Sequence, residues 1–303
     1  MNTKATERMR LFIRVYLCLL ACAFVAHAQQ AALTIITEPN AIVWIDEVRR
    51  GTTDASGKLV LTKLSPGRHT VRVRANSFKE ATATLLPGRR TLEVKLVGTS
   101  DPAVLMFQQA EKAREEARDD ASRENAAELY REALRNPPPN AAAHVGLARV
   151  LLDLNKFKEA HAEIDAARKI RRVYPEASAV DGRIYLAEGF ANDAIRAFRQ
   201  SIREARGFQP EAHVGLARVY EEQGEHALAV VELRKALDQL SDSEPVIYQM
   251  LGAAYEKMNK PKEAVAAYEK YLQLAPNGSY ATAIRSILNQ LKREAEGEQE
   301  IIP

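Results

Sequence analysis

Cysteine is almost absent from this chain of 303 residues, since its only two cysteines, Cys18 and Cys22, lie close to the N-terminus. The rest of the chain has no thiol for a disulfide, a zinc site or a nucleophile, so an oxidising compartment poses no hazard. Glycine-rich phosphate loops, paired-histidine zinc helices and nucleophile-elbow motifs are absent from the sequence too. The sequence therefore predicts no catalytic residue, no metal site and no cofactor, and we expect a protein that is not an enzyme.

Long apolar runs are also lacking. Four basic residues precede the one sustained apolar stretch, Val15–Ala26, which is too short to span a bilayer as a stable anchor. This arrangement is typical of a secretory signal peptide at residues 1–28, with cleavage after Ala28. The alternative is a lipoprotein box that ends at Cys22, which would then carry the lipid anchor. We therefore expect an exported protein, periplasmic or secreted, with no transmembrane span in the mature chain.

Strong net charge is the third absence. The whole chain has a formal net charge of +3, and residues 1–28 contain four basic side chains and one acidic side chain, so the mature protein is neutral. A neutral protein has no global field that attracts nucleic acid or a membrane surface. The composition changes at residues 99–106, where alternating apolar residues give way to a segment rich in alanine, glutamate and arginine, and we place a linker there.

Short alternating strands and turn residues fill residues 30–98. The run His69–Arg74 places valines on one face and arginines on the other, which is the pattern of a strand with one buried face. Gly and Pro at intervals mark the turns between the strands. This segment therefore predicts a small sandwich or barrel. The expected strands are Leu33–Thr37, Ala41–Ile45, Lys58–Leu64, His69–Arg74, Ala81–Leu85 and Thr91–Leu96.

The β segment also carries a resemblance. The runs Glu38–Asp46, Gly51–Thr53 and Leu64–Val71 resemble a PEGA domain, and the run Thr53–Phe78 resembles the regulatory-like domain of carboxypeptidases. Both resemblances imply a non-catalytic β-sandwich that is an accessory module of a cell-envelope protein. Since apolar residues flank Trp44 on both sides, we expect its side chain in the core of this module.

The β segment is the basic part of the mature chain, because residues 30–98 hold eleven Lys and Arg against six Asp and Glu. One interpretation is a basic patch for an acidic surface or a glycan. The other is a charged solvent face that protects the strand edges. The candidate patch comprises Arg68, Arg72, Arg74, Arg89 and Arg90.

Internal repetition is the strongest signal in the chain. The run Ala143–Val150 recurs letter for letter as Ala212–Val219, 69 residues later, which is close to two periods of about 34 residues. With a small residue in mid-helix and a bulky residue one turn away, this pattern resembles tetratricopeptide repeats. The resemblance implies five units across residues 107–278, of which the first is divergent. They start near Phe107, Ala141, Pro175, Pro210 and Pro245.

A single two-helix unit cannot bury its apolar face alone, so the units are expected to stack into a solenoid. Apolar residues at helical spacing in residues 279–293 indicate a capping helix, and residues 294–303 are expected to form a frayed tail. The predicted fold class is thus multidomain, with a small all-β sandwich followed by an all-α helical solenoid of the tetratricopeptide type.

The resemblance further implies that one stripe of each first helix lines a concave groove. On that stripe, the ninth position is Arg149, Arg183 and Arg218 in three consecutive units. Such a ladder suits an acidic or carboxylate-bearing peptide, whereas the alternative is a solvated face whose arginines pair with glutamates at helix spacing. The other candidate groove residues are Val145, Val214, Glu221, Gln249 and Glu256.

Together these features predict an exported, non-catalytic scaffold that binds a protein or peptide in the groove while the β module docks on a second envelope surface. The alternative is an anchor that binds cell-wall polymer or glycan through the β module, with the repeats as a spacer. Neither hypothesis includes a nucleic-acid partner.

Overall fold

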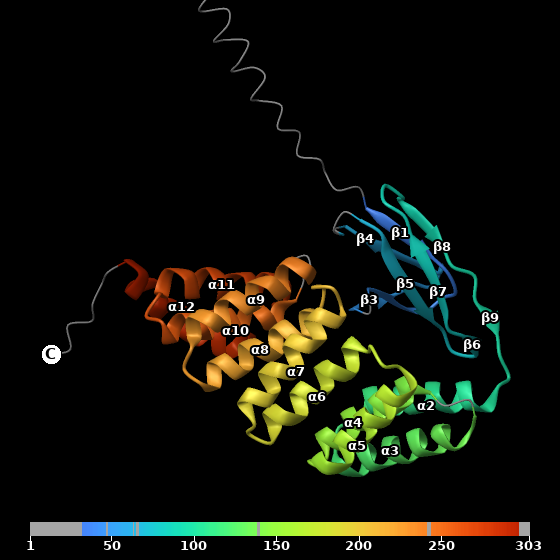
Figure 1. Ribbon diagram of the computed structural model, residues 1–303. Coiled ribbons are helices and arrows are strands. Elements are labelled where there is room, and N and C mark those ends of the chain that lie inside the picture. The colour runs from blue at the N-terminus through green and yellow to red at the C-terminus, as the bar shows by residue number, and fades with distance from the viewer. Residues whose placement is uncertain are drawn as a thin grey trace, which may run out of the picture.

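The computed structural model describes residues 32–46, 48–62, 64, 67–137, 140–240 and 244–296. The predicted signal peptide at residues 1–28, with Cys22, lies outside the described residues, as does most of the predicted tail. Within them, a β module precedes eleven helices (Figure 1), so the predicted fold class is confirmed. No helix of this part of the chain is long and apolar enough to cross a membrane.

The β module consists of two packed sheets and a short ribbon. One sheet has the order β4-β1-β8, with β8 parallel to β1, and the other has the order β3-β2-β5-β7, which is antiparallel throughout. The strands β6 and β9 form the ribbon. The strands are β1 (Leu33–Ile36), β2 (Ile42–Ile45), β3 (Val48–Thr52), β4 (Lys58–Leu61), β5 (His69–Arg74), β6 (Phe78–Lys79), β7 (Ala81–Leu85), β8 (Thr91–Glu93) and β9 (Val97–Gly98).

The core of the module lies between the two sheets, where Ile35, Val43 and Val71 are completely buried. Trp44 is not part of this core, contrary to the prediction. Successive side chains of a strand point to opposite faces, so the neighbours of Trp44 enter the core and its own ring lies on the outer face of β2. There it is half-buried, with the guanidinium of Arg72 at 4.2 Å from the ring centroid.

Several helices begin at a residue that favours the start of a helix. Pro occupies the first position of α2, α6, α8, α10 and α11, where its missing N–H costs nothing. The predicted linker at residues 99–106 is shorter than expected, because Asp101 caps α2 and the helix begins at Pro102. The helices are α2 (Pro102–Glu116), α3 (Asp120–Arg135), α4 (Ala141–Asp153), α5 (Phe157–Ile170), α6 (Pro175–Ala187), α7 (Ala191–Glu204), α8 (Pro210–Glu222), α9 (His226–Leu240), α10 (Pro245–Lys257), α11 (Pro261–Leu274) and α12 (Ala281–Glu296).

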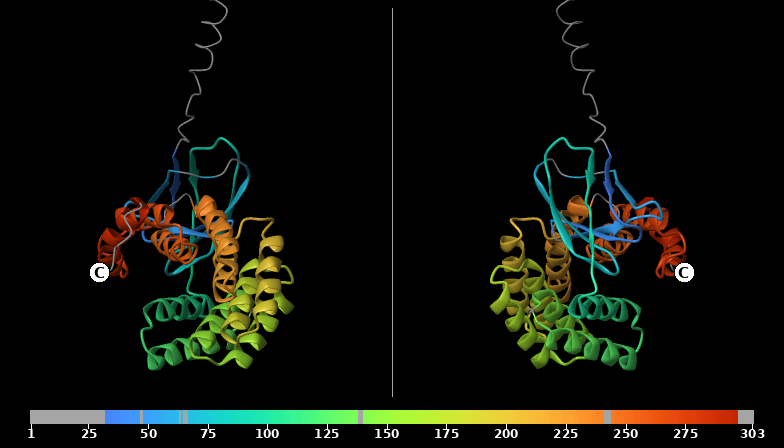
Figure 2. Two further views of the ribbon diagram at one scale, coloured as in Figure 1. Left: turned by 90° about the vertical axis from the view of Figure 1, so that its left-hand side faces the viewer. Right: turned by 90° about the vertical axis from the view of Figure 1, so that its right-hand side faces the viewer.

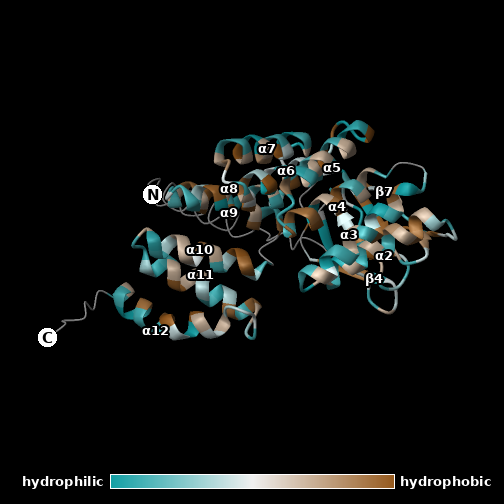
Figure 3. Cartoon of the chain, turned by 90° about the horizontal axis from the view of Figure 1, so that it is seen from below, coloured by the Kyte–Doolittle hydropathy of each residue, from teal (hydrophilic) through white to brown (hydrophobic). Residues whose placement is uncertain are grey.

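Consecutive helices pack as pairs, from α2 with α3 to α10 with α11, and each pair packs on the next. Glycine permits the closest contacts between helices. A Cβ atom on Gly146 would lie 2.4 Å from the ring of Tyr130, and one on Gly215 would lie 2.3 Å from the ring of Phe198. In Figure 3, apolar positions alternate with hydrophilic positions along the helices, as is typical of helices that bury one stripe.

The β module packs against the helical array through α2. The side chain of Gln108 donates to the carbonyl oxygens of Ala75 and Phe78 and accepts from the backbone N–H of Ser77. Arg74 was expected on a solvent face but is 7% exposed, because its guanidinium lies on Phe107 and pairs with Glu111 of α2.

Two further contacts involve β3, at the edge of the four-stranded sheet. Arg49 pairs with Glu115 near the end of α2, at 2.9 Å, and Arg50 donates to the backbone carbonyl of Gln239 at the end of α9. The two helices are far apart in sequence, and Figures 1 and 2 show the β module beside both. The array therefore curves so that β3 contacts two separate parts of it.

Candidate interaction cleft

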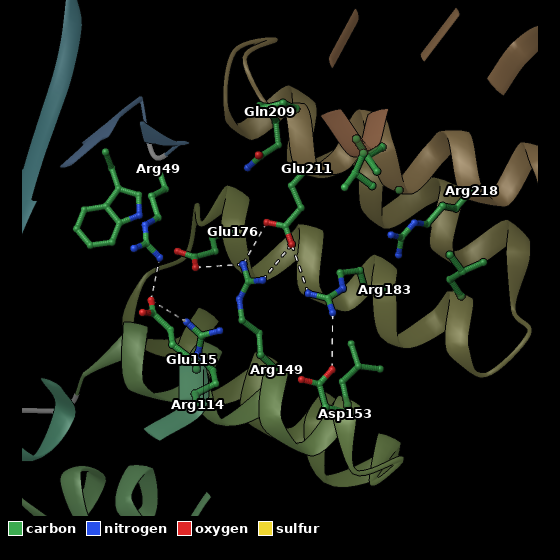
Figure 4. A pocket seen from close by; sticks show the side chains of 18 of the residues that line it. Arg49, Arg114, Glu115, Arg149, Asp153, Glu176, Arg183, Gln209, Glu211 and Arg218 are labelled. Carbon is green, nitrogen blue, oxygen red and sulfur yellow. Dashed lines mark hydrogen bonds and ion pairs between the residues drawn. The ribbon is translucent and has the colours of Figure 1, made fainter. Parts of the chain in front are cut away.

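A cleft of about 870 Å³ lies between the outer face of the four-stranded sheet and the first helices of the five helix pairs (Figure 4). The helices α2, α4, α6, α8 and α10 line one side, and Trp44 and Arg49 lie on the other. All three arginines of the predicted ladder line this cleft, so the structure brings them together, but their surroundings differ.

Arg149, on α4, is enclosed by carboxylates. Its two terminal nitrogens donate to the two oxygens of Glu211 at 3.0 and 3.1 Å, and Nη2 also donates to Glu176 at 3.2 Å. Its side chain is only 18% exposed. A bidentate pair of this kind is among the stronger charged hydrogen bonds, so Arg149 is already occupied within the chain.

The pKa of Arg149 is raised and that of Glu211 is lowered, as expected for a close ion pair. Burial alone would lower the pKa of Arg149, but Glu211 and Glu176 outweigh burial and raise it above its ordinary value. Burial alone would raise the pKa of Glu211, but Arg149 and Arg183 outweigh burial and lower it. Both groups are therefore charged over the whole physiological range of pH.

Arg183, on α6, has weaker contacts. Its nitrogens lie 3.6 Å from Glu211 and 3.9 Å from Asp153, longer than the contacts of Arg149. Burial and the positive charge of Arg149 lower the pKa of Arg183, and Arg218 contributes in the same direction. This arginine is thus only partly neutralised by the chain.

Arg218, on α8, is exposed to solvent. Within the described residues it makes no ion pair or hydrogen bond, and Figure 4 shows no contact from its guanidinium to the other residues drawn. The positive charge available to a ligand therefore increases from Arg149 to Arg218.

The remaining candidate groove residues are divided. Val214 lines the cleft, but Val145 is 1% exposed and belongs to the hydrophobic core, so it does not line the cleft as predicted. Glu221 pairs with His226 at 3.0 Å, and Glu256 accepts from the hydroxyl of Tyr268. Neither glutamate, nor half-buried Gln249, lines the cleft.

The candidate basic patch of the β module is divided as well. Arg72 and Arg74 face the helical array, and both pair with Glu80. Arg68, Arg89 and Arg90 are exposed. Since His69 pairs with Leu85 across the sheet, Arg68 lies beside the end of β7, from which the turn with Arg89 and Arg90 begins. The exposed three thus belong to one end of the module.

Sequence reasoning missed the carboxylates that hold the ladder. Glu176 and Glu211 are the second residues of α6 and α8, each directly after the proline that begins its helix. Their signal was present in the repeat register, because they occupy the same position in consecutive units.

Comparison with known proteins identifies the helical region. Two family models, both described as tetratricopeptide repeat, match residues 117–184 and residues 208–277. The helices within these two ranges are tetratricopeptide repeats. A search of curated proteins found no match.

Solved structures show the same repeat fold. A thermophilic tetratricopeptide repeat protein from Thermus thermophilus is 23% identical, with a TM-score of 0.51 over 61% of this chain and 98% of that one. A tetratricopeptide repeat protein from Parabacteroides merdae is 16% identical, with a TM-score of 0.51 over 64% and 72%. PilW, described as a widely conserved type IV pilus biogenesis factor, is 14% identical, with a TM-score of 0.52 over 67% and 97%.

Proposed function

We propose that this protein is an exported, non-catalytic scaffold that binds an acidic segment of a partner protein or peptide in the cleft between its repeats and its β module. The observation that carries this proposal is the row of three arginines along one cleft, in which Arg183 is partly neutralised and Arg218 is not neutralised by the chain. Tetratricopeptide arrays are typically interaction scaffolds, and the concave side of a solenoid is its extended binding surface.

A partner segment with carboxylates replaces water around these guanidinium groups with charge-assisted hydrogen bonds. Apolar lining residues such as Leu186 and Val214 add contact area between the charged positions. The partner is therefore a segment in which acidic and apolar side chains alternate.

The test is fluorescence polarisation with the mature full-length protein and three labelled hexapeptides. One alternates glutamate with leucine, one glutamine with leucine and one lysine with leucine. We expect the acidic peptide to bind most tightly, and its advantage to shrink as salt is raised, because exposed charges are screened within about 8 Å at physiological ionic strength. Equal binding of the three peptides, or no binding, would contradict the proposal.

We propose further that the exposed end of the β module, with Arg68, Arg89 and Arg90, docks on a second envelope surface. Exposed arginines present several donors to carboxylate or phosphate. Changing all three to alanine is expected to abolish co-sedimentation of the full-length protein with envelope fractions without altering peptide binding. If the protein instead sediments with purified cell-wall polymer and binds none of the peptides, the anchor hypothesis replaces the scaffold.

Export is tested separately. Cleavage after Ala28 predicts a soluble product whose intact mass equals that of the chain from Gln29 to Pro303. A lipid-modified Cys22 at the N-terminus would instead show an anchored lipoprotein.

A further inference from the structure

The arginines and glutamates of the cleft form a series that follows the repeat. In two successive steps, the arginine at the ninth position of one repeat contacts the glutamate at the second position of the next: Arg149 contacts Glu176 at 3.2 Å, and Arg183 contacts Glu211 at 3.6 Å. This contact recurs because equivalent residues of stacked repeats have equivalent neighbours.

The third step of the series lacks its carboxylate. Arg218 occupies the ninth position of its repeat, but the second position of the next repeat is Val246, directly after the proline that begins α10. Val246 cannot accept a hydrogen bond from a guanidinium. This substitution explains why Arg218, alone of the three arginines, has no ion pair within the described residues.

The open position is also accessible. Val246 is 46% exposed and lines the same cleft as Arg218 and Val214. Glu222 and Glu244 also line the cleft, but among the described residues neither forms an ion pair with Arg218. An exposed cation thus lies beside an exposed apolar side chain, at the place where two earlier steps of the series hold a carboxylate.

We propose that a carboxylate of the bound partner takes the place of the missing glutamate, so that Arg218 and Val246 form a specific subsite for an acidic side chain followed by an apolar one. The carboxylate accepts from Arg218, and the apolar neighbour covers Val246. Charge complementarity selects the occupant, because the exposed guanidinium of Arg218 has no carboxylate partner among the described residues and a carboxylate of the ligand supplies one. This inference rests on the proposed peptide-binding function and assigns the residues that determine its specificity.

The test restores the missing glutamate. In Val246→Glu, the new carboxylate is expected to pair with Arg218 and to compete with the ligand, so that affinity for the labelled peptide of alternating glutamate and leucine falls at least about tenfold. Arg218→Ala is expected to weaken the same peptide by a similar factor. The double variant is expected to bind the acidic peptide more weakly than either single variant, because without Arg218 the introduced carboxylate is unpaired and repels the peptide.

Val231→Glu is the matched control. Val231 is 47% exposed, lies on α9 and does not line the cleft, so this variant adds the same charge to a valine of the same exposure. Its affinity for the acidic peptide is expected to stay within about twofold of the unchanged protein. Thermal unfolding of all four variants checks that the array remains folded.

The outcomes separate the two proposals. If the unchanged protein prefers the acidic peptide but Val246→Glu and Arg218→Ala bind it as tightly, the subsite is wrong and the peptide-binding function stands. An equal loss of affinity in Val231→Glu would show that any added negative charge weakens binding, and it would also overturn the subsite. If the unchanged protein shows no preference for the acidic peptide, both proposals fail together.

Discussion

The two copies of one eight-residue sequence, Ala143–Val150 and Ala212–Val219, share contacts within their own repeat and with the preceding repeat, but their contacts with the repeats that follow differ. Inside each repeat, the histidine pairs with a glutamate of the second helix: His144 lies 2.5 Å from Glu163, and His213 lies 2.6 Å from Glu232. Toward the following repeats, identical residues have different contacts, because the residues that they meet there differ.

The valine and the arginine of the motif show the divergence. Val145 is buried while Val214 lines the cleft, and Arg149 is enclosed by two glutamates while Arg218 is exposed. A repeat motif therefore determines the fold of its own unit, and the surface that it presents depends on the following unit. The predictions below test this division.

The largest expected effect is on Arg149. Replacing it with alanine leaves Glu176 and Glu211 without their main cation, and removing one partner of a buried pair costs about 3–5 kcal/mol. Since both side chains keep some contact with water, we expect a loss of about 2–4 kcal/mol in the free energy of unfolding, measured with urea. A loss below about 0.5 kcal/mol would place Arg149 among ordinary surface residues.

The glycines test what the two copies share. Gly146→Ala would place a methyl group against the ring of Tyr130, and Gly215→Ala would place one against the ring of Phe198. Both variants should lose about 1–3 kcal/mol by overpacking. Retention of full thermal stability in either overpacked variant would show that the helices can separate at no cost.

The histidine pairs differ in burial, not in partner. The His213 pair is more buried than the His144 pair, with side chains 7% and 12% exposed against 19% and 26%. A buried acceptor that loses its donor costs about 1–3 kcal/mol, so His213→Ala should destabilise more than His144→Ala in matched urea titrations. The reverse order would mean that burial does not control the strength of these pairs.

Acid should affect the network of the first copy. The pKa of Glu211 is lowered in the folded state, so its contribution is complete above the ordinary carboxyl value and is lost as pH falls below about 4.5. The stability difference between the unchanged protein and Glu211→Gln should therefore shrink as pH decreases from about 5 to about 3. A difference that is constant over this range would contradict the ion-pair origin of the stabilisation.

The smallest effect on stability is expected at Arg218. Since Arg218 is exposed and has no ion pair within the described residues, Arg218→Ala should change the free energy of unfolding by no more than about 0.5 kcal/mol. The contrast with Arg149→Ala, measured under the same conditions, is the sharpest test of the comparison. Equal losses in the two variants would show that the identical motifs are also energetically identical.

The repeat fold was predictable because its determinants recur. The period, the small residue in mid-helix and the bulky residue one turn away appear several times, so that an error in one unit is corrected by the others. The position of the three arginines on one stripe followed from the same register.

Apart from Glu176 and Glu211, which occupy one repeat position, the parts that were missed do not recur. The strand β3 has two arginines and a glycine in Val48–Thr52 and lacks an alternating apolar pattern, so it gave no strand signal. The contacts of Arg49, Arg50 and Gln108 with distant elements join the modules, and a contact between segments far apart in sequence has no local pattern. To predict that Trp44 lies on the outer face, one must know which residues of β2 face the core, and the apolar neighbours of Trp44 do not show this.

The contacts of β3 with both α2 and the end of α9 change what kind of object the array is. In a free solenoid each repeat contacts only its neighbours, so the two ends can move independently. Here the edge strand β3 contacts both the first and the fourth helix pair, so these two parts of the array are linked through the β module. A ligand that widens the cleft would therefore have to lengthen or break the contacts of Arg49 and Arg50.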